Sequence, residues 1–486
     1  MNPFTLASGG LLRGDRYDLR KATMLDLIRI AYKVPPETIL GGPNWLEFDR
    51  FDIAAKAPGD SSPEVVRLML QSLLAERFHL AVHSEMRPMP AYALTPDRPK
   101  MRTSDGTGSP VCEYVPQPTG STMDEYSCRN ETMADFAFRL RSVASDYLQD
   151  PVVDATGLDG TWDFELRWNR RSRLLPAGTD RTTIFDALRK QLGLNLIPGD
   201  APSAALVIDH VERPATNAPD VAKKLPRREL AFEVASLKLN KAGERSLFRA
   251  MRGGIEVTAM PLGSLMAFAW DMNTVHEGKR FVGMPKGVDS VYVDIVGKTT
   301  KNANAPGMNV ASEFDDDLRA MTRVLLTERF KIKWHYEDRP VEAISLTAGK
   351  PKLTPADTTH RASCHQGRTI ANDPRDVNPL LSQLISCRNV TMAQLASKLQ
   401  EIDDFEFVYP VNDATGLKGS WDFDLSFTPG EQFLRSVGKT GADSLEPSGV
   451  VSLGEALGRL GLKLEKRRRM LPVIVIDHME LTPTAN

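Results

Sequence analysis

The stretch that decides the organisation of this chain is Pro151-Val-Val-Asp-Ala-Thr-Gly-Leu-Asp-Gly-Thr-Trp-Asp-Phe-Glu-Leu166. It recurs later in the chain as Pro410-Val-Asn-Asp-Ala-Thr-Gly-Leu-Lys-Gly-Ser-Trp-Asp-Phe-Asp-Leu425. Shorter blocks recur in the same order: Leu74-Ala-Glu-Arg-Phe78 with Leu326-Thr-Glu-Arg-Phe330, Ser127-Cys-Arg-Asn-Glu-Thr-Met-Ala134 with Ser386-Cys-Arg-Asn-Val-Thr-Met-Ala393, and Val207-Ile-Asp-His210 with Val475-Ile-Asp-His478. A repeat this long indicates two copies of a whole domain rather than a solenoid.

The repeat predicts the domain boundaries. We expect copy one at residues 1–217, a linker at 218–228 and copy two at 229–486. The linker is poor in apolar residues and punctuated by Pro219 and Pro226, which favours a semi-extended segment. Copy one has no counterpart of Leu230–Leu239, a predicted strand, and its first residues do not resemble a signal peptide. We therefore expect that a leader and a first strand are missing from copy one.

Helical and strand patterns are mixed in each copy without regular βαβ alternation, which predicts an α+β fold. Each copy is expected to divide near its Cys-containing loop into two small mixed lobes. Because Arg-Pro follows the strand at His79–His83, we expect a hairpin between it and Ala91–Leu94. Lys466–Arg469 is expected at the solvated tip between two closing strands. The predicted helices are Leu25–Tyr32, Pro63–Phe78, Met133–Val143 and Phe185–Leu192 in copy one, and Leu262–Trp270, Asp315–Phe330, Met392–Leu399 and Leu453–Leu460 in copy two.

Composition excludes several classes of protein. The chain has 486 residues, of which 41% are hydrophobic, and 61 Lys and Arg offset 63 Asp and Glu to leave a net charge of −2. This near-neutral charge gives no general attraction to nucleic acid or anionic lipid, so we expect no nucleic-acid partner. Apolar runs such as Leu262–Trp270 are shorter than the roughly 20 residues of a membrane helix, so no transmembrane segment is expected.

The four cysteines form two matched pairs. Cys112 and Cys128 lie in copy one, and Cys364 and Cys387 lie at corresponding places in copy two, although the loop between them differs in length. Retention of both ends of a changed loop favours one disulfide within each copy, and disulfides imply an oxidising compartment. Four free thiols in a cytoplasmic protein are the alternative. A zinc site is disfavoured because neither pair has the usual close spacing of zinc ligands.

Several motifs together carry a family resemblance: Phe232-Glu-Val-Ala-Ser-Leu-Lys238, Gly41-Gly-Pro-Asn-Trp-Leu46, Arg50-Phe-Asp-Ile53, Leu73-Leu-Ala-Glu-Arg-Phe78, Asp154-Ala-Thr-Gly-Leu158 and Val207-Ile-Asp-His-Val-Glu212. In this combination the chain resembles an uncharacterised family, expanded in acidobacteria, whose domain of unknown function is usually exported and sometimes fused to BlaR-type membrane metallopeptidases. Copy two departs from the pattern at Val282-Gly-Met-Pro-Lys-Gly287. The resemblance implies export and brings no catalytic residues.

A second likeness concerns Thr183–Leu196, which is similar to the small βαββ modules at the N-termini of secretins and TonB-dependent receptors. Those modules mediate contacts in the cell envelope. The likeness implies a protein or cell-envelope component as the partner.

The candidate chemical groups are Asp209 with His210 and Asp477 with His478, at the ends of the closing strands. A carboxylate beside an imidazole can act as a general base in hydrolysis. Adjacent residues of a strand point to opposite faces, however, so neither Asp is expected to orient its neighbouring His. His79 and His83 have the spacing of a helical zinc pair, but their segment alternates like a strand and copy two has Lys331 at the first position.

These observations favour a non-catalytic binding or scaffold protein, periplasmic or secreted, with no catalytic residue, cofactor or metal site. A bivalent arrangement would raise its avidity. The alternative is a hydrolase that uses the Asp-His pairs.

Overall fold

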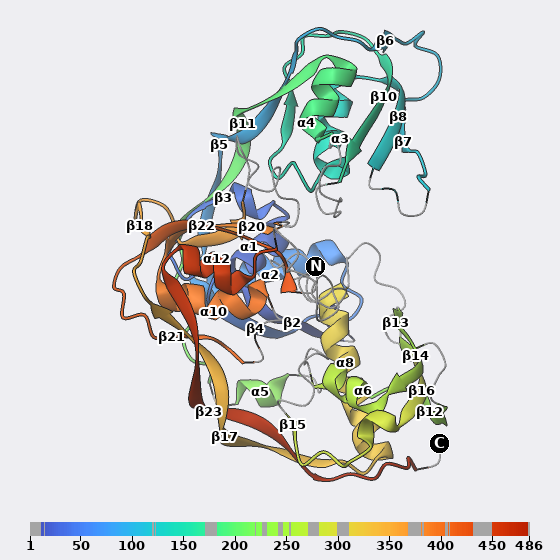
Figure 1. Ribbon diagram of the computed structural model, residues 1–486, viewed down its shortest axis with the longest axis vertical. Helices are drawn as coiled ribbons and strands as arrows, with labels where there is room; N and C mark the ends of the chain where they lie inside the picture. Colours follow the sequence, from blue (N-terminus) through green and yellow to red (C-terminus); the bar gives the residue numbers. More distant parts are fainter. Residues whose placement is uncertain are drawn as a thin grey trace, which may run out of the picture.

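The computed structural model describes residues 11–13, 15–118, 121, 123–170, 182–218, 220–225, 231–241, 246–251, 254–270, 281–298, 311–367, 381, 383–403, 407, 409–430 and 450–484. Each copy consists of two lobes joined by a long two-stranded ribbon (Figure 1). The ribbon is formed by β5 (Ala81–Pro96) and β11 (Leu194–His210) in copy one, and by β17 (Lys333–Ala348) and β23 (Leu462–His478) in copy two. The predicted α+β fold, with two homologous domains of two lobes each, is confirmed.

Hydrophobic packing is separate in the four lobes. In copy one, Leu206 and Ile208 at the end of β11 belong to the core of the first lobe, whereas Leu94 and Leu194 belong to the core of the second. Each ribbon therefore contributes residues to a different core at each end. Between these ends the ribbon strands are mostly exposed.

The first lobe of each copy packs two helices against an antiparallel sheet. The strand order is β1-β2-β4 in copy one and β12-β16-β14-β13 in copy two. Nothing among the described residues of copy one takes the place of β12 beside β4. The elements are β1 (Leu11–Arg13), β2 (Arg16–Thr23), β4 (Arg50–Lys56), α1 (Met24–Tyr32) and α2 (Pro63–Phe78) in copy one, and β12 (Val234–Asn240), β13 (Leu247–Met251), β14 (Gly254–Pro261), β16 (Tyr292–Lys298), α6 (Leu262–Ala269) and α8 (Ala311–Arg329) in copy two.

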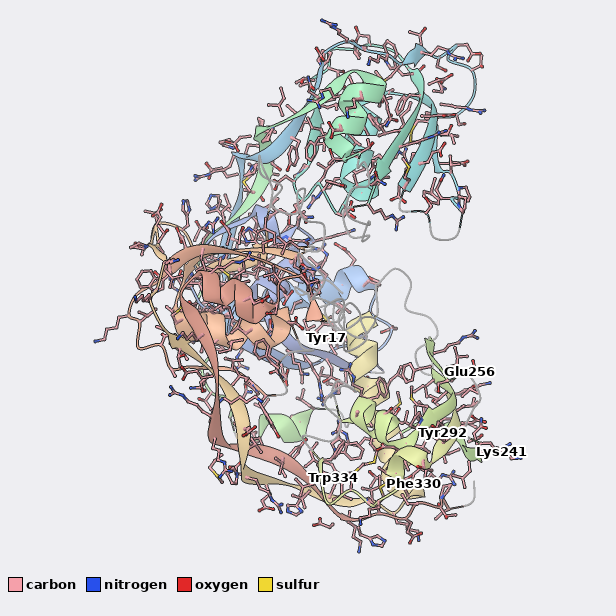
Figure 2. All side chains as sticks on the ribbon, viewed as in Figure 1. Tyr17, Lys241, Glu256, Tyr292, Phe330 and Trp334 are labelled. Atoms are coloured by element: carbon pink, nitrogen blue, oxygen red, sulfur yellow. A yellow bond between two sulfur atoms is a disulfide. The ribbon has the colours of Figure 1, made fainter. Side chains whose placement is uncertain are left out.

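The helices begin and end where local chemistry favours it. Thr23 and Asp26 form a capping box at the start of α1, and Ser62 accepts a hydrogen bond from the backbone N–H of Val65 at the start of α2. Such caps satisfy backbone donors that the helix itself leaves free. In copy two, Trp334 lies on β17 near Phe330 at the end of α8 (Figure 2). Phe330 is fully buried in the core of this first lobe.

The second lobe, which we call the disulfide lobe, has strand order β6-β10-β8-β7 in copy one and β18-β22-β20-β19 in copy two. Cys112 is bonded to Cys128 on the neighbouring strand, and Cys364 is bonded to Cys387 in the same way, which confirms both predicted disulfides. The elements are β6 (Arg102–Thr103), β7 (Val111–Tyr114), β8 (Met123–Glu131), β10 (Trp162–Asn169), α3 (Met133–Val143) and α4 (Ile184–Ala187) in copy one, and β18 (Thr354–Pro355), β19 (Ser363–Gln366), β20 (Gln383–Val390), β22 (Trp421–Phe427), α10 (Met392–Ile402) and α12 (Leu453–Arg459) in copy two.

Two sequence predictions about the ribbons are wrong. Arg87 and Pro88 lie within the continuous strand β5, not in a hairpin turn. Likewise Lys466–Arg469 lies inside β23, directly opposite Glu342 and its neighbours on β17, and not at a tip. A proline is tolerated on a two-stranded ribbon because each strand has one open edge, where no backbone N–H is needed.

Short parallel strands cover only the ends of each ribbon. They are β3 (Ile39–Gly41) and β9 (Val152–Asp154) in copy one, and β15 (Phe281–Val282) and β21 (Asn412–Asp413) in copy two. Within the predicted linker, the described part contains the short helix α5 (Val221–Lys224), while residues 226–228 lie outside the described residues. No helix in the described parts of the chain is long and apolar enough to cross a membrane.

The two copies contact each other through the loop Gly41–Asp49 of copy one, which we call the docking loop. It contacts α10, Asn389 of β20 and the segment before β19 in copy two. The backbone N–H of Ala362 donates to the side-chain oxygen of Asn44 (2.8 Å), and Gln394 Nε2 donates to the Asn44 carbonyl (3.0 Å). Arg361 forms an ion pair with Glu47 (3.0 Å) and also donates to the carbonyl oxygens of Ile39 and Gly41.

Apolar and charged contacts extend this interface. Phe48 packs against the core of the copy-two disulfide lobe, and Lys398 Nζ lies 5.7 Å from the centre of its ring. Arg50 forms an ion pair with Glu401 at 2.6 Å. Among the described residues, the docking loop with its neighbours Ile39 and Arg50 thus contacts both α10 and the Arg361–Ala362 segment of copy two.

Candidate functional site

A row of alternating charges lies on the exposed part of the copy-one ribbon. His83 Nδ1 lies 2.9 Å from both carboxylate oxygens of Asp209 on the neighbouring strand. His83 Nε2 lies 3.8 Å from Glu85, and Arg87 donates to Glu85 at 2.9 Å. His83, Glu85 and Arg87 share one face of β5 because they are spaced two residues apart.

Copy two repeats this row. His335 Nδ1 lies 2.9 Å from Asp477, His335 Nε2 lies 3.8 Å from Glu337, and Arg339 donates to Glu337 at 2.8 Å. In both copies these side chains keep between 39% and 50% of their surface exposed. We call each set of four residues the charged row.

A β-bulge lies at the aspartate of each charged row. In copy one, Ile208 and His210 pair with consecutive residues of β5, so Asp209 is the extra residue. In copy two, Ile476 and His478 pair with consecutive residues of β17, and Asp477 is the extra residue. Asp209 and Asp477 lie two residues beyond Val207 and Val475, which pair with the histidines, so each carboxylate is on the same face of the ribbon as the histidine that it contacts.

The structure therefore separates the members of each predicted Asp-His pair. Asp209 contacts His83, whereas His210 Nε2 lies 3.0 Å from Glu212. Asp477 contacts His335, whereas His478 lies 3.8 Å from Glu480. The expectation that neither Asp orients its sequence neighbour is confirmed.

His79 and His83 also face different carboxylates. His79 Nδ1 lies 3.2 Å from Glu212, while His83 contacts Asp209 and Glu85. Among the residues that the structure describes, no three His, Cys, Asp or Glu side chains are grouped so that they could hold a metal ion.

Electrostatics favours the charged form of the groups in the row. The hydrogen bond that His83 donates to Asp209 raises the pKa of His83, and the nearby carboxylate of Glu85 adds to this effect. In copy two, the hydrogen bond from Arg339 lowers the pKa of Glu337. The carboxylates that face both of its ring nitrogens stabilise the imidazolium form of His83.

This pairing predicts the titration of His83. In Asp209→Asn the pKa of His83 should fall toward its ordinary value of about 6.5, because a neutral amide no longer stabilises the imidazolium. NMR titration of the assigned His83 ring protons measures it, and Asp200→Asn on the exposed part of β11 is the matched control. Unchanged His83 titration in Asp209→Asn would contradict the pairing.

The same pairing sets a direction for stability against pH. Because folding raises the pKa of His83, its contribution to stability is complete below the pKa of the unfolded state. That contribution is lost as the pH rises through the raised value. The free energy of unfolding of Asp209→Asn should therefore fall below that of the wild type by more at acidic than at alkaline pH, as measured by urea unfolding.

Sequence reasoning missed the charged row although a signal was present. His83-Ser-Glu-Met-Arg-Pro88 and His335-Tyr-Glu-Asp-Arg-Pro340 are identical at the alternate His, Glu and Arg and at the final Pro, and they differ at the two positions between His and Arg. Such a pattern marks one face of a strand. Its connection to Asp209 and Asp477 depends on the register of a strand more than a hundred residues away.

Comparison with known protein families gives two matches, to residues 25–211 and 263–479, and both are to the model described as "Protein of unknown function (DUF3738)". The chain belongs to the DUF3738 family. The two matches correspond to the two copies, so the chain carries a tandem pair of DUF3738 domains. No curated protein and no solved structure matches it. Each DUF3738 match contains one charged row and one of the two cysteine pairs.

Proposed function

We propose that this tandem DUF3738 protein is a non-catalytic binding or scaffold protein of the periplasm or the extracellular space. In this proposal the charged row on each ribbon is the contact surface, and a protein or another component of the cell envelope is the partner. The observation that carries it is the repetition of the row: its His, Glu, Arg and Asp are the same in both copies, whereas Ser84 and Met86, which lie between them on β5, are Tyr336 and Asp338 on β17.

Stability alone is a weak reason to keep such a row. Exposed ion pairs typically contribute only about 0–1 kcal/mol each, because solvent screens them and side-chain entropy opposes them. The members of the row are about half exposed. A surface that is kept in both copies without a large effect on folding fits recognition better than packing.

The edges of the ribbon favour contact through this face. Pro88 and Pro90 lie on β5, and Pro198 and Pro202 lie on β11. On β23 the corresponding stretch carries Lys466–Arg469. Prolines and dense positive charge both oppose the addition of another strand to an open edge. Side chains, not edge hydrogen bonds, are therefore the proposed means of recognition.

Binding is also supported over hydrolysis by the state of the histidine. A general base needs an unprotonated ring nitrogen within reach of its substrate. In copy one both ring nitrogens of His83 already face carboxylates, Asp209 at Nδ1 and Glu85 at Nε2. The two disulfides support a location outside the reducing cytoplasm.

The test is retention of the purified full-length protein on isolated bacterial sacculi and, separately, on envelope membrane vesicles. Wild-type protein should be retained on one of the two preparations. Arg87→Gln/Arg339→Gln should weaken retention by about tenfold or more. The retention of each single variant should lie between those of the wild type and the double variant, because a protein with one intact row keeps one contact but loses the gain from bivalency.

A matched control uses exposed arginines outside the ribbons. Arg189→Gln/Arg249→Gln removes one charge from each copy. Arg189 forms an ion pair with Asp186 and Arg249 forms one with Glu256, just as Arg87 and Arg339 each pair with one carboxylate. This control should bind as the wild type does. Equal retention of the two double variants would contradict the assignment of the surface, and no retention of the wild type would contradict an envelope partner.

A further inference from the structure

The docking loop of copy one has a counterpart in copy two that is not docked on the copy-one disulfide lobe. Gly41 and Gly283 both have left-handed backbone, with φ of 74° and 81°, beside the equivalent strand ends at Ile208 and Ile476. Two residues later, the carbonyls of Pro43 and Pro285 accept the N–H of Leu46 and Val288. Lys286 therefore stands at the position of Asn44, and it is exposed.

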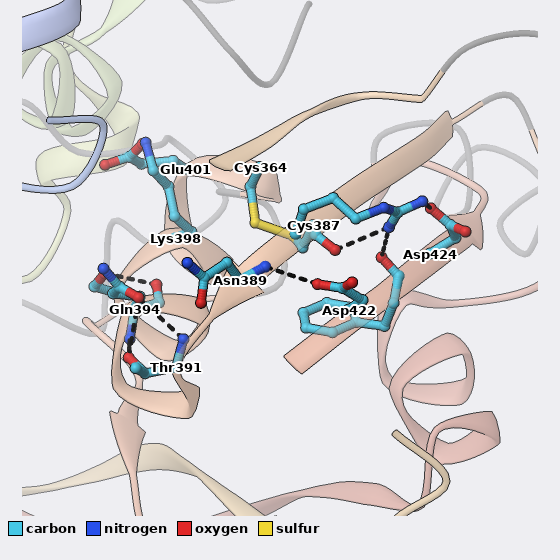
Figure 3. The surroundings of a disulfide bond; sticks show 12 residues. Cys364, Cys387, Asn389, Thr391, Gln394, Lys398, Glu401, Asp422 and Asp424 are labelled. Atoms are coloured by element: carbon cyan, nitrogen blue, oxygen red, sulfur yellow. Dashed lines mark hydrogen bonds and ion pairs between the residues drawn. A yellow bond between two sulfur atoms is a disulfide. The ribbon is translucent and has the colours of Figure 1, made fainter. Parts of the chain in front are cut away.

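The surface that receives the docking loop also has a counterpart, in the copy-one disulfide lobe. Asn389 and Asn130 both have left-handed backbone, with φ of 53° and 54°. Each donates from Nδ2 at 2.6 Å to an equivalent loop carbonyl, that of His360 in copy two and of Gly108 in copy one. Figure 3 shows Asn389, Thr391 and Gln394 on this surface in copy two.

The copy-one surface differs at two of the three positions whose copy-two equivalents contact Asn44, and at the third Asn130 corresponds to Asn389. Asp135 replaces Gln394 as the third residue after the threonine cap. Pro110 replaces Ala362, so the backbone N–H that binds the Asn44 side chain is missing. Asn130 Oδ1 is buried and has no hydrogen-bond partner among the described residues. This surface has lost the Gln394 and Ala362 donors and has gained the Asp135 carboxylate beside the Asn130 oxygen, which suits a lysine in place of an asparagine.

The docked and undocked pairs of surfaces also differ in where they carry an aromatic residue. The docked pair of surfaces has Phe48 on the loop and Ser397 on α10. The undocked pair has Ser290 on the loop and Phe138 on α3. Phe138 is 86% exposed, the largest exposure of any large hydrophobic side chain in the described part of the chain. Each pair of surfaces thus carries one aromatic side chain, on opposite partners.

We propose that the Gly283–Ser290 loop of one chain docks onto the copy-one disulfide lobe of a second copy of this chain. Lys286 would pair with Asp135 and donate to Asn130, and Phe138 would be covered. The two surfaces of one chain cannot meet each other, because β15 and α3 lie at opposite ends of the molecule (Figure 1). Along the resulting assembly, copy one and copy two alternate. Within each chain they are joined by the docking loop, and between chains they are joined by the Gly283–Ser290 loop. This inference is independent of what the charged rows bind.

The test is sedimentation velocity of the full-length protein over a range of concentrations. Wild-type protein should associate, and salt should weaken the association because exposed charges are screened. Lys286→Glu and Asp135→Lys should each weaken it by about tenfold or more, since each places like charges against each other. An equimolar mixture of the two variants should associate again, because the glutamate introduced on one chain then meets the lysine introduced on the other.

Lys418→Glu is the matched control. Lys418 is an exposed lysine on another turn of copy two, and its replacement changes the net charge by the same amount as Lys286→Glu. It should associate as the wild type does. A monomeric wild type at all concentrations, association of both charge variants equal to that of the wild type, or failure of the mixture to recover would each overturn the proposal.

Carbodiimide cross-linking gives a second readout that does not depend on the strength of association. It should join Lys286 to Asp135 between chains, which mixed isotope labels distinguish from a link within one chain. Cross-links at other positions only, in a protein that associates, would also overturn the proposal.

Discussion

Arg361→Ala should separate the two copies while leaving each of them folded. The Arg361 and Glu47 side chains are only 12% and 13% exposed, and Arg361 also donates to the carbonyls of Ile39 and Gly41. Removing one partner leaves Glu47 largely buried without its counter-charge. Breaking a buried ion pair in this way typically costs about 3–5 kcal/mol, so we expect a loss at the lower end, about 3 kcal/mol, in the contact between the copies.

Small-angle X-ray scattering should show a larger radius of gyration for Arg361→Ala than for the wild type. Calorimetry should show that the thermal unfolding transitions of the two copies are less coupled. Arg388→Ala is the matched control on the same lobe. Arg388 pairs with Asp424, but both side chains are 42% or more exposed, so its loss should cost about 1 kcal/mol or less. Equal effects of the two substitutions would contradict the role of Arg361 in docking.

Cys364→Ala/Cys387→Ala should destabilise one lobe selectively. The disulfide closes a loop with a sequence separation of 23. In the chain-entropy model a bond of this kind contributes about 3–4 kcal/mol by restricting the unfolded chain. Because the disulfide lobe of copy two has its own hydrophobic core, we expect this loss to appear as an early transition of that lobe rather than as a shift of the whole unfolding curve.

The equivalent variant in the other copy provides the comparison. Cys112→Ala/Cys128→Ala should lower the transition of the copy-one disulfide lobe and leave that of copy two in place. Hydrogen exchange followed by mass spectrometry assigns each transition to its lobe. If either variant lowered the protection of backbone amides from exchange evenly in all four lobes, the prediction that the four cores unfold independently would be wrong.

Local sequence chemistry predicted the features that depend on near neighbours. The duplication, the cysteine pairing and the helices Pro63–Phe78 and Met133–Val143 were all readable from the chain. Each depends on residues close in sequence or on direct comparison of the two copies. That comparison works without a structure because equivalent positions face the same local constraints.

Features that depend on register were not predictable in the same way. The Arg-Pro dipeptides suggested turns because proline interrupts most strands, but a ribbon with open edges accepts them. The contact of Asp209 with His83 depends on the register of a strand that is distant in sequence. The docking loop joins Asn44 to Gln394, and no local pattern shows that these segments meet.

The placement of β11 and β23 also bears on the order in which the chain can fold during synthesis. The core of each first lobe includes residues from the end of its copy: Leu206 and Ile208 in copy one, and Ile474 and Ile476 in copy two. The disulfide lobe is nested between the two parts of the first lobe and is continuous in sequence. It can therefore form its core before the first lobe receives its last strand. As the chain emerges N-terminus first, each copy should close from the inside outward, and the earlier-made half of the first lobe must wait with an incomplete core until its copy is finished.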